Sequence, residues 1–143
     1  MTVAEERRKR RRVLIGAQGK KGKLDRLWGH AVMLAAGGIC QLCGKPNSSD
    51  PHHLIHKSAG HRFRWVFDNG LLLCAGCHRF NTTVAAHGGG LRFTDLVREK
   101  LPGVSAWYEI AFLHNKQLGS KTHTLEELEE IREELESIIA EYE

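Results

Sequence analysis

Two Cys-x-x-Cys pairs constrain this chain more than any other feature of its sequence. The first is Cys40-Gln41-Leu42-Cys43 and the second is Cys74-Ala75-Gly76-Cys77, and they use all four cysteines. Zinc binds four thiolates tetrahedrally, and two such short loops supply that geometry. A redox motif would be single and set in a thioredoxin-like unit, and plain buried cysteines would need no pairing. The pattern predicts a structural zinc site that ties together the ends of residues 44–73.

The segment between and just after the cysteine pairs holds side chains suited to chemistry. His52-His53 follow Pro51, Asn69 lies in a turn before Gly70, and His78 directly follows Cys77. Histidine titrates near neutral pH and is also a common metal ligand. Five other histidines have no assigned role, and each is expected at the surface or in packing: His30, His56, His61, His114 and His123.

Hydrophobic spacing and turn residues predict helices and short strands. The apolar residues of 24–36 recur at the helical period, and Gly37-Gly38 end that helix. Strands are expected at 52–56 and 71–73, and alternating basic and aromatic residues predict another strand or extended segment at 62–67. Further helices are expected at residues 78–86, 91–101 and 106–113.

A last helix is expected to begin after Thr124, which forms a capping box with Glu127. Its apolar residues fall on one stripe: Leu125, Leu128, Ile131, Leu135, Ile138 and Tyr142. The stripe can pack on the rest of the chain, or it can form a homodimer. It spans fewer than three heptads, so the pattern favours packing over a coiled coil.

Charge is unevenly placed along the 143 residues. Residues 1–23 hold nine Lys/Arg and two Glu, whereas residues 120–143 hold two Lys/Arg and nine Glu. A basic body with an acidic tail suggests a polyanion as partner, and charge alone does not separate DNA from RNA or from an anionic membrane. Residues 1–23 are interpreted as a flexible basic arm that contacts DNA, with a solvated helix start or ragged terminus as the alternative. No apolar run approaches a membrane span, and the start lacks a secretory signal. We therefore expect a cytoplasmic protein, in the host cytoplasm if it is phage-borne.

The order His52-His53, Asn69-Gly70-Leu71-Leu72-Leu73-Cys74 and Cys77-His78 resembles the HNH (ββα-metal) endonuclease family, and most closely its small phage-type members with a four-cysteine zinc site. The resemblance covers roughly residues 24–93. It implies an α+β fold, in which a small ββα-metal core is stapled by zinc and flanked by N-terminal and C-terminal helices. The corresponding division is an arm at 1–23, a nuclease core at 24–100 and a helical extension at 101–143.

The resemblance also implies roles in hydrolysing DNA phosphodiester bonds. His53 matches the general base, Asn69 matches the residue that fixes the base or its strand, and His78 belongs to the catalytic set. His52 and His78 match the positions that hold one divalent ion, with His87 as a possible third ligand. Phosphate contacts are expected from three basic residues: Lys57, Arg62 and Arg64.

Two features of His52 complicate this interpretation. Many family members have Asp there, and an imidazole shifts metal preference from Mg²⁺ toward Mn²⁺, Ni²⁺ or Zn²⁺. Adjacent strand residues also face opposite sides, so His52 and His53 can serve one site only if the strand bends or the site lies at its edge. Two other functions compete: a non-catalytic zinc-dependent DNA-binding module, and an assembly factor whose acidic helix recruits a partner.

Overall fold

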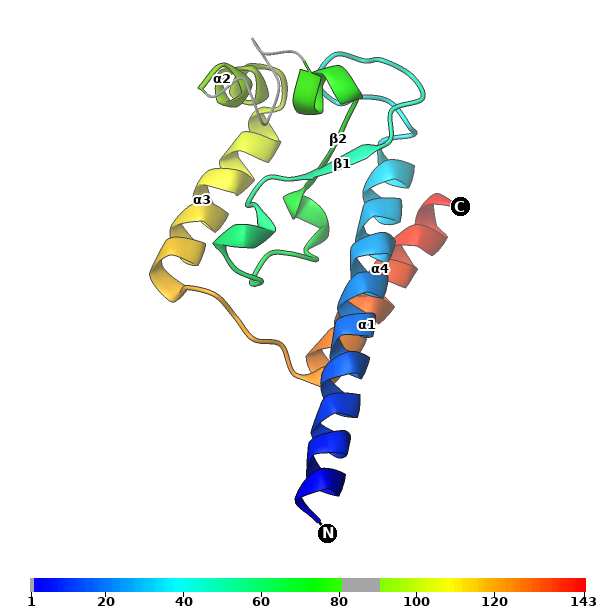
Figure 1. Cartoon of the computed structure of the whole chain (residues 1–143). Coiled ribbons are helices and arrows are strands. Elements are labelled where there is room, and N and C mark those ends of the chain that lie inside the picture. The colour runs from blue at the N-terminus through cyan, green and yellow to red at the C-terminus, as the bar shows by residue number, and fades with distance from the viewer. Residues whose placement is uncertain (1, 81–90) are drawn as a thin grey trace.

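The computed structural model describes residues 2–80 and 91–143, with the backbone alone described for residues 7–18, 80 and 91. Helices surround a two-stranded antiparallel sheet, so the predicted α+β class is confirmed (Figure 1). The elements in chain order are α1 Val3–Ala35, β1 Asp50–His53, η1 Lys57–Ala59, η2 Phe67–Asn69, β2 Gly70–Leu73, η3 Gly76–Phe80, α2 Leu91–Lys100, α3 Pro102–Leu118 and α4 Leu125–Tyr142.

Helix α1 is much longer than the predicted helix of residues 24–36. It begins at Val3, where Thr2 and Glu5 form a capping box, and its first half projects past the body (Figure 1). Residues 3–23 are therefore helical and continuous with the body, which agrees with the alternative of a helix start and differs from a flexible arm. Alanine and the long charged side chains favour a helix, and they outweigh the cost of about 1 kcal/mol for each interior glycine. The predicted end is confirmed, since Gly37 and Gly38 have φ of 64° and 70°.

Strand β2 is the centre of the molecule and is buried on both faces. Leu72 packs in one apolar cluster with α1 and α4, whereas Leu71 and Leu73 pack in a second cluster with the cysteines and α2. This explains the continuous apolar run, because a strand covered on both sides does not alternate in polarity. Strand β1 pairs with it in the register His52–Leu71 and His53–Gly70.

Gly70 lets α1 cross the sheet at close range. A Cβ atom built there would overlap Cγ2 of Val32 and lie 3.0 Å from Cζ2 of Trp28. Close backbone approach of this kind requires glycine. The crossing brings Trp28 over the end of β1, next to His53.

The segment 62–67 is a correction to the prediction. It forms successive turns, with Arg64 N–H donating to the His61 carbonyl and Val66 N–H to the Phe63 carbonyl at 3.3 and 3.2 Å, rather than a strand. Its alternation of basic and aromatic residues has another cause: Trp65 enters the core, while Arg64 reaches α1. Strand β1 spans residues 50–53, so it begins and ends earlier in the chain than the predicted strand of residues 52–56.

The C-terminal helix α4 uses its apolar stripe within the chain. Thr124 and Glu127 form the predicted capping box. Leu128, Leu135 and Ile139 are buried against α1, which runs beside α4 (Figure 1). Packing on the body is therefore confirmed for the middle of the stripe, whereas Leu125 and Tyr142 are about half exposed, and dimerisation stays a prediction. Helices α2 and α3 match the expectations at 91–101 and 106–113, although α3 is longer at both ends.

Candidate active site and metal centre

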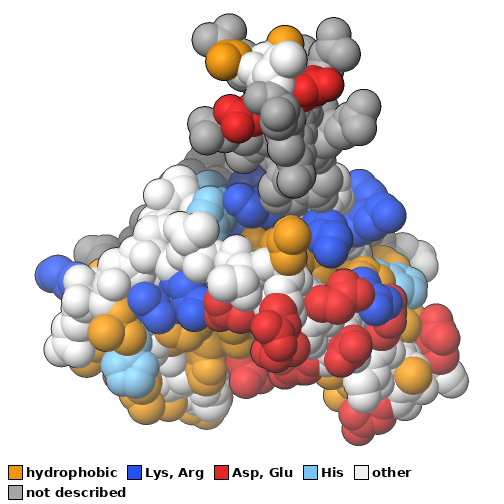
Figure 2. All heavy atoms as spheres, turned by 90° about the horizontal axis from the view of Figure 1, so that it is seen from below, with side chains coloured by type: hydrophobic (Ala, Val, Ile, Leu, Met, Phe, Trp, Pro, Cys, Tyr) orange, Lys and Arg blue, Asp and Glu red, His pale blue; other side chains and the backbone are white. Residues whose placement is uncertain are grey.

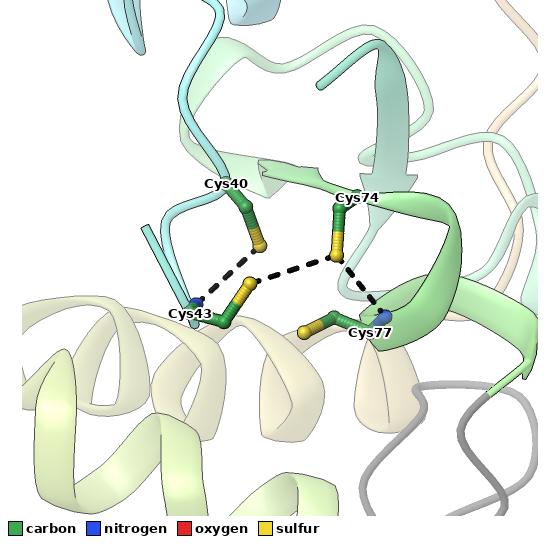
Figure 3. A group of neighbouring side chains, drawn as sticks. All are labelled: Cys40, Cys43, Cys74 and Cys77. Atoms are coloured by element: carbon green, nitrogen blue, oxygen red, sulfur yellow. Dashed lines mark hydrogen bonds between the residues drawn. The ribbon is translucent and has the colours of Figure 1, made fainter. Parts of the chain in front are cut away.

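The four cysteine side chains form a cluster at one end of the sheet (Figure 3). Their Sγ atoms all lie within 4.8 Å of one another, and the Sγ atoms of Cys43 and Cys74 are 3.6 Å apart. Tetrahedral zinc with bonds of about 2.3 Å separates its sulfur ligands by about 3.8 Å. The residues present therefore fit a four-thiolate metal site.

In each Cys-x-x-Cys loop the backbone N–H of the second cysteine points at the Sγ atom of the first. Cys43 N–H points at Cys40 Sγ at 3.5 Å, and Cys77 N–H points at Cys74 Sγ at 3.4 Å. Gly44 permits the first loop, since its φ of 80° is in the left-handed region. Backbone N–H donors of this kind stabilise thiolates, which are the form that binds a metal.

The thiols affect one another's protonation. Burial raises the pKa of Cys40, but backbone N–H groups outweigh that effect and lower it to about 7. Burial and the adjacent sulfurs raise the pKa of Cys43. The same two causes raise the pKa of Cys77 much further. Four thiolates at this spacing therefore need a cation to balance their charge.

The first cysteine loop is joined directly to β2. Gln41 N–H donates to the Leu72 carbonyl at 2.9 Å, and Leu72 N–H donates to Oε1 of Gln41 at 2.8 Å. The metal cluster thereby holds both ends of the segment that carries the histidines, as the cysteine spacing predicted.

A second cluster joins β1 to η3. The rings of His52 and His78 meet edge to face with centroids 5.4 Å apart, and Phe93 of α2 packs on His52 at 5.6 Å. Asp50 places Oδ2 3.1 Å from Nδ1 of His78. The structure thus brings together two of the predicted metal ligands and adds Asp50, whose signal in the sequence is its place two residues before His52 on the same strand face. His87 lies outside the described residues.

His53 has different neighbours from His52. Its ring stacks on the indole of Trp28, with centroids 3.8 Å apart and planes inclined by 7°, and its Nε2 lies 2.8 Å from the Arg64 carbonyl oxygen. Burial lowers the pKa of His53 to about 4, although the Arg64 carbonyl acts in the opposite direction. The ring is therefore neutral near pH 7. Since a carbonyl only accepts, Nε2 carries the hydrogen and Nδ1 carries the lone pair.

Asn69 is fully buried, and within the part of the chain that the structure describes its amide group binds backbone groups alone. Its Oδ1 accepts from Ile55 N–H at 2.7 Å, and its Nδ2 donates to the carbonyls of Ile55 and Phe63 at 3.1 and 3.0 Å. These bonds hold the chain that leaves β1 against the start of β2. That arrangement is consistent with the fixing role that the resemblance implied.

Two of the three predicted phosphate contacts have partners inside the protein. Arg64 makes a two-pronged ion pair with Asp25 of α1, at 2.9 and 2.6 Å. Arg62 donates to the carbonyls of Leu118 and Gly119 at the end of α3. Lys57 is exposed on η1. Sequence reasoning missed the partners of Arg64 because an ion pair across 39 residues leaves no local pattern.

A hollow of about 770 Å³ lies between α1 and α4, away from both clusters. Basic residues of α1, among them Lys20, Lys23 and Arg26, form one wall. Glu129 and Glu136 on the α4 wall are paired with Arg132 of the same helix. On the face of the molecule seen from below, acidic side chains form a patch, and lysine and arginine side chains lie beside it (Figure 2).

The fold and site define a small α+β domain held by a four-cysteine metal site, with a histidine cluster on its first strand. Residues 40–83 match the family model described as HNH endonuclease, so the chain holds an HNH domain over that segment. No curated protein and no solved structure matches the chain. The domain points to a nuclease or DNA-binding function with a metal site. None of the described helices is both long and apolar enough to cross a membrane.

Proposed function

We propose that this protein is a metal-dependent endonuclease that hydrolyses DNA phosphodiester bonds, with His53 as general base. The observation that supports it most is the state of His53, a neutral ring with one nitrogen held by the Arg64 carbonyl. A neutral imidazole of known tautomer can take a proton from water at Nδ1. The residue also lies inside the segment that matches the HNH model.

The proposed second component is a divalent ion held by the cluster around His52 and His78. When bound, such an ion polarises the scissile phosphate and offsets charge on the leaving 3′-oxygen. Asp50 engages Nδ1 of His78, which is the usual way in which a carboxylate orients a metal-binding imidazole. His78 would then bind the ion through Nε2, and His87 remains a predicted further ligand.

The two faces of β1 would then have different roles, one in binding the ion and the other in activating water. His52 contacts His78 and Phe93, whereas His53 contacts Trp28. We infer that the phosphate binds at the edge of β1 that does not pair with β2. Water bound there would lose its proton to Nδ1 of His53, the resulting hydroxide would attack phosphorus, and the bond to the 3′-oxygen would break.

The four-cysteine site is proposed to hold zinc in a structural role. All four positions come from protein thiolates, which is the closed arrangement of structural zinc. It would tie the loop of Cys40 and Cys43 to β2 and η3, and it takes no part in the proposed chemical step.

The test is cleavage of supercoiled, linear, single-stranded and branched DNA with Mg²⁺, Mn²⁺, Ni²⁺ or Zn²⁺. We expect the parent to cut with at least one ion and His53→Ala to lose cutting, with zinc content and DNA binding retained. His114→Ala changes an exposed histidine of α3 and serves as the matched control. Undiminished cutting by His53→Ala would show that the base is another group.

The second candidate function is a zinc-dependent DNA-binding module without catalysis. It is favoured by the commitment of Asn69 to backbone bonds, which a purely structural residue also makes. A parent protein that binds DNA but cuts none of the substrates with any ion would support this alternative.

A further inference from the structure

We propose that Asp25 and Trp28, both on α1, are positioning residues that set the orientation of the His53 ring. The inference rests on the proposed role of His53, but it concerns residues outside the segment that matches the HNH model. It assigns α1 a part in the reaction beyond packing, because both contacts to His53 depend on this helix.

Trp28 restrains the plane of the ring. Its indole is buried and lies parallel to the imidazole at 3.8 Å. The indole is itself held, because its Nε1 donates to the Val66 carbonyl at 2.9 Å. A ring stacked on an immobile neighbour cannot tilt about its long axis without losing that contact.

Asp25 restrains the carbonyl that binds Nε2. That carbonyl belongs to Arg64, in the turn of residues 61–65, which is not itself part of the sheet. The Arg64 guanidinium is fixed by two bonds to Asp25, and Asp25 Oδ1 also accepts from Trp65 Nε1 at 2.8 Å. The carboxylate thereby holds two successive residues of the turn, and with them the carbonyl that faces His53.

The strength of this restraint follows from its charges and burial. Burial raises the pKa of Asp25, but hydrogen bonds from Arg64 and Trp65 outweigh it and leave the pKa below its ordinary value. Side chains of both partners are partly buried, with exposed fractions of 13% for Arg64 and 31% for Asp25. A two-pronged pair in such surroundings has one geometry, whereas a single lysine contact would permit several.

The first experiment replaces the carboxylate by an amide. Asp25→Asn keeps an oxygen acceptor for Trp65 and removes the charge that fixes Arg64. We expect kcat for plasmid cleavage to fall about 10-fold to 100-fold with KM changed less than about twofold, as misplacement of a reacting group produces. Asp95→Asn makes the same substitution in the exposed Asp95–Arg98 pair of α2, which has a single contact of 3.5 Å, and is the surface control.

The second experiment restores the pair in reverse. Since the Nε2 acceptor is a main-chain carbonyl, Asp25→Arg combined with Arg64→Asp keeps it and exchanges the charges of the pair. Trp65 Nε1 loses its acceptor in Asp25→Arg and in the double variant alike, so recovery of the double variant over Asp25→Arg reports the ion pair. We expect each single variant to lose activity and the double variant to recover at least about 10-fold over them. Loss in the singles without recovery in the double would assign the residues a general structural role and overturn the proposal.

For Trp28 the comparison is between Phe and Leu. Trp28→Phe keeps an aromatic ring over His53, and Trp28→Leu removes it while preserving an apolar side chain. We expect kcat to be lower for Leu than for Phe by about 10-fold at equal zinc content. Equal rates for the two variants would exclude a role for the stack.

A spectroscopic measurement separates this proposal from the proposed function. ¹⁵N spectra of the His53 ring should show the Nε2–H tautomer in the parent and a mixture with Nδ1–H in Asp25→Asn, with Asp95→Asn unchanged. If the parent cuts no DNA, the proposed function fails and the tautomer alone decides the positioning claim. An unchanged tautomer in a folded Asp25→Asn protein overturns it in either case.

Discussion

Oδ2 of Asp50 lies 3.1 Å from Nδ1 of His78, although the two residues are 28 positions apart in the chain. The contact joins the start of β1 to η3, the element that also carries Cys77. It supplies a carboxylate beside the histidines in a chain that has His52 where many HNH proteins have Asp. Asp50 therefore places a carboxylate two residues before His52, on the same strand face.

Asp50→Asn is predicted to weaken binding of the proposed catalytic ion by about 10-fold to 100-fold, because the amide orients His78 less strongly than a carboxylate. The measurement is the concentration of Mn²⁺ or Mg²⁺ that gives half-maximal cleavage. Asp68→Asn changes an exposed carboxylate of η2 and should leave that concentration unchanged. If Asp50→Asn needs no more metal than the parent, Asp50 has no part in the ion site.

Cys74→Ser is predicted to release the metal and unfold the centre of the molecule. Cys74 belongs to the cluster of β2, and loss of one thiolate removes a ligand from a set with none to spare. The free energy of metal binding is folding free energy in such domains. Zinc content by elemental analysis and near-ultraviolet circular dichroism test this, with a strong chelator added to the parent as the parallel case. A folded, metal-free Cys74→Ser protein contradicts the structural role.

Asn69→Ala is predicted to lower the free energy of unfolding by about 3 kcal/mol or more, since it leaves one buried N–H and two carbonyls without the amide. Urea unfolding measures the difference. Asn115→Ala removes a more exposed amide that makes one bond, to the Ala59 carbonyl, and should cost less than about 1 kcal/mol. Similar losses in the two variants would mean that Asn69 does not hold the segment after β1.

The pH dependence of stability should report the burial of His53. The unfolded chain takes up a proton near pH 6.5, whereas the folded protein takes it up only near pH 4. Between these values the unfolded state binds more protons, so the contribution of the neutral ring is complete above pH 6.5 and is lost as pH falls to 4. It amounts to at most about 3 kcal/mol at 1.36 kcal/mol per pKa unit.

Urea unfolding of the parent and of His53→Gln at pH 7.5 and pH 5 tests this prediction. The pKa values of His61 and His123 are also lowered by burial, but both histidines are present in the two proteins and their effect cancels in the comparison. The parent should lose more stability than His53→Gln on acidification. Equal losses would place His53 in a solvated environment.

Local patterns were sufficient for the elements whose cause is local. The paired cysteines, the capping box at Thr124 and the glycines after α1 all act within a few residues, and each appears in the structure as predicted. The order of histidines and asparagine around them identified the HNH segment for the same reason, since the motif is read along the chain.

Segment 62–67 and helix α1 show where local patterns misled. The alternation at 62–67 has the period of a strand, but it arises because Trp65 and Arg64 bind partners on different elements. The glycines of residues 16–22 suggested an irregular arm, whereas the structure continues one helix through them. Propensity is a sum over a long segment, and a few unfavourable residues do not interrupt it.

The sequence by itself determined the metal-binding set and the domain class, because cysteine spacing and motif order are properties of the chain alone. Only the tertiary structure decided what surrounds each histidine. Trp28, Asp25 and Asp50 reach the site through the crossing of α1 over Gly70 and the pairing of β1 with β2. Contacts across 28 to 39 residues depend on how elements pack, and packing is governed by the shapes that meet rather than by neighbours in sequence.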